Sequence, residues 1–488
     1  MHALAVSMLC LLARCPLDSD FKSSDTRSRY EELRANWVAQ SEQLAAQCEA
    51  AGQGELADSI RDALSPPGHS LENLPVPQFQ IASTTAKNPP SRSEAQATWA
   101  KLRKQYGRDL FDLAGKAFRA GEVSTSYDLV REVLVCDPDH GQARALLGYT
   151  KYQDQWVTPF AAGKLRSGYV WHPRFGWIPK AQVVHHENGE QFWKGQWLPT
   201  DEVAKYRSLW ANAWQMETDH YLVQTNVSLE RGVELATRLE KLYAVFFRLF
   251  AGFFSSRDQT ALLFDPPGRR SAIGNLHDAE RKPQRKFRVN FYRTRQEYLD
   301  TLRPHVKSGL DQSTGMYLTG TRTAYFFAQS RSDETIVVHE ATHQLFSESR
   351  EHRHGDGSRG NYWAIEGIAC YMETFLDHGD RIELGSWDAA RLRRGKQRLQ
   401  SFMPLERFVQ LDMKQFDGPE LPMLYCQAAC LARFLMHDEG GRFRDAFVKY
   451  LEQVYLGKAD YETLAELLDT DYATLDRDFH RHVEESRK

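Results

Sequence analysis

The chain of 488 residues is long enough for roughly two to four domains. Its hydrophobic fraction of 42%, with 11 Trp, 20 Tyr and 26 Phe, is ample for buried cores. A net charge of −3 gives no whole-chain reason to expect a nucleic-acid partner or an anionic membrane. The seven cysteines are scattered and form no CxxC pair, which argues against a disulfide scaffold and a cysteine zinc site. We interpret Cys370, Cys426 and Cys430 as small buried hydrophobes.

The N-terminus allows two interpretations. Residues 3–13 form an apolar stretch with the length of a signal-peptide core, but no Lys or Arg precedes it, and Arg14-Cys15-Pro16 is a poor cleavage site. If residues 1–20 are a signal, we expect a secreted or periplasmic protein; if they are an ordinary or misassigned start, we expect a cytoplasmic one. No later stretch reaches the roughly 20 apolar residues of a membrane span, so we predict none.

The next segments are predicted to be helical, then extended, then helical again. Residues 21–64 are rich in Glu, Ala, Gln and Leu, with a break at Gly52-Gln53-Gly54. Residues 65–93 are rich in Pro and Ser and predict an extended linker that is not packed. Residues 94–153 predict two helices and a third that begins at 145–148. This region resembles tetratricopeptide-type repeats, with a generic helical hairpin as the alternative. If a protein partner exists, we expect it to bind here.

A short internal repeat follows in residues 154–207. Trp156, Trp177 and Trp197 each begin a short motif that includes proline, and the three copies lie about twenty residues apart. The segment is dense in aromatic and β-branched residues with turn residues between them. We predict a small β module whose tryptophans chiefly pack its own core; binding of a peptide or glycan by exposed tryptophans is the alternative.

Residues 208–488 predict one continuous α+β domain. Residues 220–227 alternate as a strand, and Ser228 is a plausible N-cap for the amphipathic helix that follows. Further strands are predicted at 287–292, 315–318 and 323–327, the last two as a hairpin, with a helix at 294–302. The remainder is predicted to be largely helical.

The segment His339-Glu340-Ala341-Thr342-His343 has the spacing of a zinc site. Two histidines four residues apart on a helix project from the same face, so both imidazoles can reach one ion. Glu340 follows the first histidine and can act as general base on a metal-activated water. HExxH alone is only moderately specific, but here it lies in an apolar helix where polar residues need a reason to be present.

A third metal ligand is predicted at Glu366, 23 residues after His343. Catalytic zinc usually takes three protein ligands and leaves one position open. Glu366 lies in the apolar run Trp363-Ala364-Ile365-Glu366-Gly367, where a carboxylate must be paired or metal-bound. The alternative without a metal site is a helix with two surface histidines and Glu366 in a salt bridge.

These motifs resemble those of the gluzincins, metallopeptidases with HExxH and a downstream glutamate ligand. Residues 363–371 are similar to the W-x-x-E-G-x-A-x-Y pattern of bacterial peptidase-like domains of unknown function in that group, and the resemblance covers roughly residues 208–483. It implies a zincin-like catalytic domain, in which a small mixed sheet and an active-site helix precede a helical subdomain. It also implies Zn²⁺ as cofactor, a peptide or protein substrate, and Tyr425 as oxyanion donor; a plain core tyrosine is the alternative for Tyr425.

The chain departs from the group at one position. Some gluzincins carry an aspartate, bonded to a zinc histidine, four residues after the glutamate ligand, and this chain has Cys370 there. The partner of the zinc histidines is therefore unassigned by sequence. A metzincin site is excluded because Phe346 and Ser349 replace the glycine and histidine it needs. His352 and His354, in a polar loop, are weaker ligand candidates, and the basic run at 391–398 predicts a solvated face rather than a nucleic-acid site.

The sequence thus predicts a gluzincin-like zinc peptidase. We expect an endopeptidase rather than an aminopeptidase, because no substrate-anchoring motif of the aminopeptidase type is visible. Two alternatives remain. One is an inactive peptidase-fold scaffold whose N-terminal half binds a partner, and the intact Glu340 argues against it. The other is a zinc hydrolase of a non-peptide amide.

Overall fold

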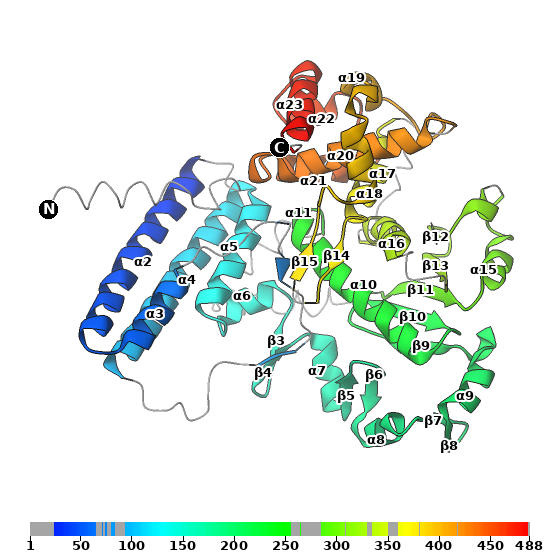
Figure 1. Ribbon diagram of the computed structural model, residues 1–488, viewed down its shortest axis with the longest axis horizontal. Coiled ribbons are helices and arrows are strands. Elements are labelled where there is room, and N and C mark those ends of the chain that lie inside the picture. The colour runs from blue at the N-terminus through cyan, green and yellow to red at the C-terminus, as the bar shows by residue number, and fades with distance from the viewer. Residues whose placement is uncertain are drawn as a thin grey trace, which may run out of the picture.

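The protein is described by a computed structural model, in which an N-terminal helical region, a central sheet and a C-terminal helical part follow one another (Figure 1). The structure describes residues 24–64, 71, 74–75, 80–82, 93–254, 264, 285–307, 309–328, 334–349, 360–379, 381–416 and 418–486. The apolar stretch at the N-terminus and most of the predicted linker lie outside these residues. None of the described helices is long and apolar enough to cross a membrane.

The N-terminal region is helical, as predicted. Its helices share one core and are α2 (Ser24–Ala50), α3 (Gly54–Asp62), α4 (Glu94–Ala120), α5 (Val123–Cys136) and α6 (Gly141–Leu146). The break after residue 50 is confirmed. Helix α4 ends at Gly121, a left-handed C-cap. The third helix was predicted too late in the chain: α6 precedes Gly148, which has φ +84° and belongs to the turn after it.

Two short strands lie within the segment predicted as a linker. Strand β1 (Leu74–Pro75) pairs with β15 (Arg381–Glu383), and β2 (Gln80–Ala82) pairs with β4 (Gln155–Val157). Leu71 and Leu74 are buried in the main core. The prediction of an unpacked linker is therefore wrong at these positions, because two apolar side chains in a Pro-rich stretch are enough to anchor it to a distant strand.

The Trp-rich region consists of three hairpin–helix units, and the three repeated tryptophans each lie on the second strand of a hairpin. The units are β3 (Thr150–Tyr152), β4 (Gln155–Val157) and α7 (Pro159–Arg166); β5 (Tyr169–His172), β6 (Gly176–Pro179) and α8 (Val183–Glu187); β7 (Glu190–Trp193), β8 (Gln196–Pro199) and α9 (Thr200–Arg207). Trp156 is buried, whereas Trp177 and Trp197 are half-buried. The region is thus not one small sheet, and the intervening helices were not predicted.

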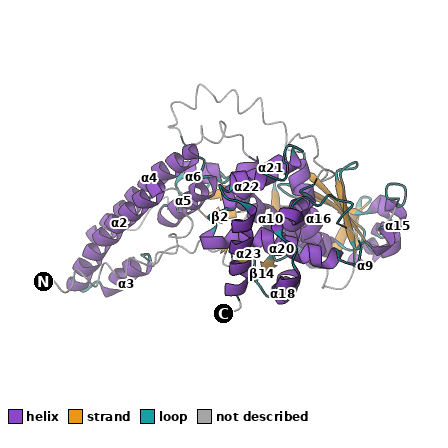
Figure 2. Ribbon diagram, turned by 90° about the horizontal axis from the view of Figure 1, so that it is seen from above, coloured by secondary structure: helices purple, strands orange, loops and turns teal. Residues whose placement is uncertain are grey.

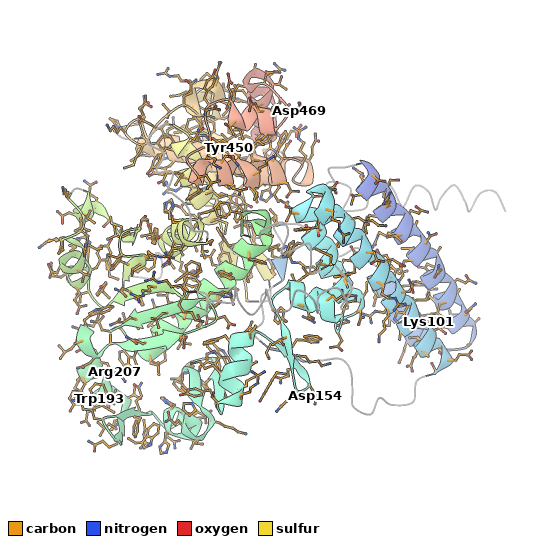
Figure 3. All side chains as sticks on the ribbon, turned by 180° about the vertical axis from the view of Figure 1, so that it is seen from behind. Lys101, Asp154, Trp193, Arg207, Tyr450 and Asp469 are labelled. Atoms are coloured by element: carbon orange, nitrogen blue, oxygen red, sulfur yellow. The ribbon has the colours of Figure 1, made fainter. Side chains whose placement is uncertain are left out.

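The last hairpin–helix unit is held together by aromatic contacts. In Figure 3, Trp193 and Arg207 lie side by side, with the guanidinium carbon 4.7 Å from the ring centre. The ring of Tyr206 stacks with that of Trp193 at 5.6 Å.

The central sheet has five strands in the order β12-β13-β11-β10-β9. Strands β10, β11 and β13 are parallel, and β9 and β12 join antiparallel at the two edges. The bounds are β9 (Trp214–Glu217), β10 (Tyr221–Thr225), β11 (Phe287–Tyr292), β12 (Gly315–Leu318) and β13 (Thr323–Phe327). The four strands predicted in this part of the chain are confirmed, and β9 was not predicted.

Helices cover both faces of this sheet. Helices α10 (Leu229–Leu249) and α16 (Glu334–Glu348) share the main core with Ala324 and Phe326 of β13, whereas Tyr325 and Phe327 pack with α15 (Arg295–Leu302). The alternation follows from the two-residue period of a strand. Figure 2 shows the orange strands between α16 and α15. The predicted cap Ser228 accepts the expected backbone hydrogen bond. Thr294, predicted as the first residue of its helix, is also an N-cap and accepts from the Glu297 N–H.

The C-terminal part is mainly helical, which confirms an α+β fold. It contains α17 (Tyr362–Met372), β14 (Leu376–Asp377), β15, α18 (Ala390–Gln397), α19 (Leu405–Phe408), α20 (Leu421–His437), α21 (Arg444–Tyr455), α22 (Thr463–Leu467) and α23 (Tyr472–Glu485). All three cysteines interpreted as hydrophobes are buried here. The small three-stranded sheet of β1, β14 and β15 was not predicted.

Candidate metal centre

Helix α16 places the two histidines of the HExxH segment side by side. Its other face, with Val338, Ala341 and Leu345, is fully buried and fixes the helix against the core. The His339 and His343 side chains are 12% and 17% exposed, and their Nε2 atoms lie 3.1 Å apart. The predicted spacing therefore brings both imidazole nitrogens to one point.

Helix α17 brings Glu366 to the same point. Trp363, fully buried, stacks on Phe447 and Tyr450 and anchors the start of the helix. Gly367 faces the backbone of α20, where a Cβ would meet the Ala428 carbonyl oxygen at 2.8 Å. The glycine after the glutamate therefore lets α17 and α20 approach closely.

The start of α17 is fixed by an asparagine in a left-handed conformation. Asn361, at φ +59°, precedes the helix and accepts a 2.7 Å hydrogen bond from the hydroxyl of Tyr450. Its amide also donates to the carbonyl oxygens of Ala459 and Asp460. Asparagine tolerates this backbone region better than most residues. The label in Figure 3 places Tyr450 within the helical C-terminal part.

The three predicted ligand atoms converge. Glu366 Oε2 lies 3.4 Å from His339 Nε2 and 3.7 Å from His343 Nε2, and one atom of each residue lies within 4.8 Å of the other two. Three buried acceptor atoms in one place repel one another unless a proton or a cation lies between them. Two imidazoles and a carboxylate are a donor set that suits Zn²⁺. The residues therefore fit the ion that the sequence predicted.

Electrostatics within the cluster agree with this geometry. Burial alone would lower the pKa of His339, but hydrogen bonds with Cys370, Glu366 and Glu373 raise it well above its usual value. Burial would raise the pKa of Glu366, but the two histidines hold it well below the usual value. Both shifts favour a positive charge beside the Glu366 carboxylate.

Glu373, one residue beyond the C-terminus of α17, provides the histidine partner that the sequence left unassigned. Its Oε1 lies 2.8 Å from His339 Nδ1, and its Oε2 accepts a 2.7 Å hydrogen bond from Arg391 Nε. A proton on Nδ1 leaves the Nε2 lone pair of His339 free for a metal. The signal in the sequence is the spacing, because Glu373 follows Glu366 by seven residues, two helical turns on the same face.

Glu340 lies at the open edge of the sheet. Its Oε2 accepts a 2.8 Å hydrogen bond from the backbone N–H of Tyr317 in β12. Among the strands that the structure describes, β12 pairs with β13 alone, so this contact is on the free edge of the strand. The carboxylate is thus held by the strand and is not part of the group of candidate ligands.

Two tyrosines flank Glu366. The hydroxyl of Tyr362, not predicted from the sequence, donates a 2.7 Å hydrogen bond to Glu366 Oε1, which leaves Oε2 for a metal. Tyr425 of α20 is half-buried, and its ring centre lies 5.1 Å from the guanidinium carbon of Arg391. Burial, then the charges of Glu366 and Cys370, raises the pKa of Tyr425, so its hydroxyl stays protonated and can donate.

A second group of potential ligands shares His339. Its Nδ1, the thiol of Cys370 and the carboxylate of Glu373 also lie within 4.8 Å of one another. Burial raises the pKa of Cys370 to about 11, which disfavours the thiolate that a metal needs. Glu373 is also engaged by Arg391. The group of His339, His343 and Glu366 is therefore the better metal site. The loop histidines His352 and His354 lie outside the described residues.

Neither the protein-family models nor the curated protein sequences with which the chain was compared match it.

Proposed function

We propose that the protein is a zinc-dependent peptidase of the gluzincin type. The observation that carries the proposal is the convergence of His339 Nε2, His343 Nε2 and Glu366 Oε2 on one point, with the Glu340 carboxylate held beside it. Zinc bound by these three ligands would polarise the scissile carbonyl and lower the pKa of an attacking water.

The residues of the chain then have defined tasks. Glu340 takes the proton from the water as the water oxygen bonds to the carbonyl carbon, and it passes that proton to the amine nitrogen as the C–N bond breaks. Glu373 keeps the proton of His339 on Nδ1. Tyr425 is the candidate donor to the developing oxyanion. The free edge of β12 offers backbone groups with which an extended peptide can pair.

The test uses purified protein loaded with one equivalent of Zn²⁺ and a broad library of quenched fluorescent peptides. We expect the wild type to cleave, and Glu340→Gln to keep its zinc while kcat falls by about a hundredfold or more, because general base catalysis typically contributes that much. Zinc-loaded wild type that cleaves no member of the library would refute the proposal and favour the scaffold alternative.

A further inference from the structure

Helix α18 forms a wall beside the metal centre. Arg391, in its first turn, donates through Nε to Glu373, the residue that holds His339. The guanidinium lies against the ring of Tyr425, yet the side chain is 34% exposed. Among the described residues, neither Nη group of Arg391 has a hydrogen-bond partner. Two N–H₂ groups next to the proposed catalytic tyrosine are therefore available to a ligand.

Two more arginines continue this wall. With 100° per residue, Arg391 and Arg394 lie about 60° apart around α18, on one flank of the buried stripe formed by Leu392 and Gly395. Arg398 is the C-cap residue that follows the helix. Arg394 and Arg398 are exposed, and no carboxylate in the described part of the chain lies within 4.0 Å of either guanidinium. We call these three residues the α18 arginine row.

The row lies over the part of α20 that carries Tyr425. Gly395 of α18 lies against α20, where a Cβ would meet the Cys426 carbonyl oxygen at 3.2 Å. Burial raises the pKa of the Cys426 thiol, and the charges of Arg391 and Arg394 oppose that rise. The dipole of α18 favours cations at its C-terminal end and so stabilises the positive charges of Arg394 and Arg398. It disfavours a cation in the first turn, where Arg391 lies, and Glu373 offsets that cost.

We propose that the α18 arginine row binds a carboxylate of the peptide substrate. The inference rests on the proposed function, because Arg391 lies beside Glu373 and Tyr425 of the candidate metal centre. Among the described residues, Glu373 is the one acidic partner of the row, and it engages Arg391 alone. Guanidinium groups bind carboxylates through paired, charge-assisted hydrogen bonds. The carboxylate comes either from an acidic side chain, which suits an endopeptidase, or from the free C-terminus, which suits a carboxypeptidase.

The test measures binding by the zinc-loaded Glu340→Gln protein, which is expected to hold a peptide without cleaving it. Three fluorescent peptides that differ only at one Glu or Gln position and at the C-terminus are compared by anisotropy. The first has Glu and an amidated C-terminus, the second has Gln and a free C-terminus, and the third has Gln and an amidated C-terminus. We expect one of the two peptides with a carboxylate to bind about tenfold more tightly than the neutral peptide.

Adding Arg394→Gln should abolish this difference in affinity. Arg393→Gln is the control, since Arg393 lies on the other flank and donates to the Asp388 carbonyl oxygen.

The proposal is overturned if the three peptides bind equally, if none binds, or if the preference survives Arg394→Gln. The two proposals can fail separately. If the wild type cleaves nothing but a carboxylate preference is found, carboxylate binding by the α18 arginine row is supported and the peptidase proposal is refuted. If the wild type cleaves peptides but shows no carboxylate preference, the peptidase proposal is supported and the role of the row is refuted.

Discussion

At the scale of single residues, the candidate metal centre depends on how its proposed ligands are held. His339 has carboxylates on both ring nitrogens, Glu366 toward Nε2 and Glu373 on Nδ1, and Glu366 is in turn bonded by Tyr362. HExxH could be read from the sequence because it is local. Glu373 could not be assigned, because nothing in the sequence shows whether a carboxylate two turns beyond Glu366 reaches the first or the second histidine, or neither.

Glu373→Gln should weaken zinc binding by about ten- to a hundredfold, because the neutral amide supports the imidazole less than a carboxylate does. The measurement is competition for Zn²⁺ with a chromogenic chelator. Glu383→Gln is a matched control, since Glu383 Oε2 lies 2.9 Å from Nε2 of His378, which is not one of the candidate ligands. Equal affinities for the wild type and Glu373→Gln would contradict the role we assign to Glu373.

At the scale of elements, the site is built where α16, α17 and β12 meet. The strands of the central sheet could be predicted because their two-residue pattern and their turn residues agree. The hairpin–helix units were harder, because each strand of 3 or 4 residues is too short to show a period. The approach of α17 to α20 at Gly367 is a tertiary contact, and the sequence shows only the glycine.

Gly367→Ala should destabilise the protein by about 1–3 kcal/mol, because the added methyl group overlaps the Ala428 carbonyl oxygen and must push α17 away from α20. Urea unfolding measures the change. Gly163→Ala in α7 is the control: a Cβ there meets nothing within 4 Å, so the variant should gain about 0.5–1 kcal/mol from helix propensity alone. If Gly367→Ala is as stable as the wild type, the close helix contact is not required.

At the scale of the whole molecule, the N-terminal helices dock on the sheet domain through buried charges. Asp128 of α5 lies 3.2 Å from both Arg131 and Arg248, the latter on α10, and Ser124 N–H donates to Asp445 of α21. Composition predicted several domains but not this interface, because it joins residues that are more than a hundred positions apart. The pairing of β1 with β15 escaped prediction for the same reason.

Asp128→Asn should destabilise the protein by about 3–5 kcal/mol, since it leaves two largely buried arginines without their counter-charge. We expect a lower midpoint of urea unfolding and faster proteolysis between the helical region and the sheet domain. The comparison is Asp25→Asn, which removes an exposed pair with Arg29 and should change stability by less than about 1 kcal/mol. Similar effects of the two substitutions would show that the buried charges do not hold the regions together.

The most direct measurement of the central claim is a crystal structure of the zinc-loaded protein with anomalous data at the zinc edge. We predict one strong anomalous peak per chain, bonded to His339 Nε2, His343 Nε2 and Glu366 Oε2, with Glu340 beside it and not bonded. A peak between His339 Nδ1, Cys370 and Glu373, or a chain that binds zinc at neither group, would contradict the account.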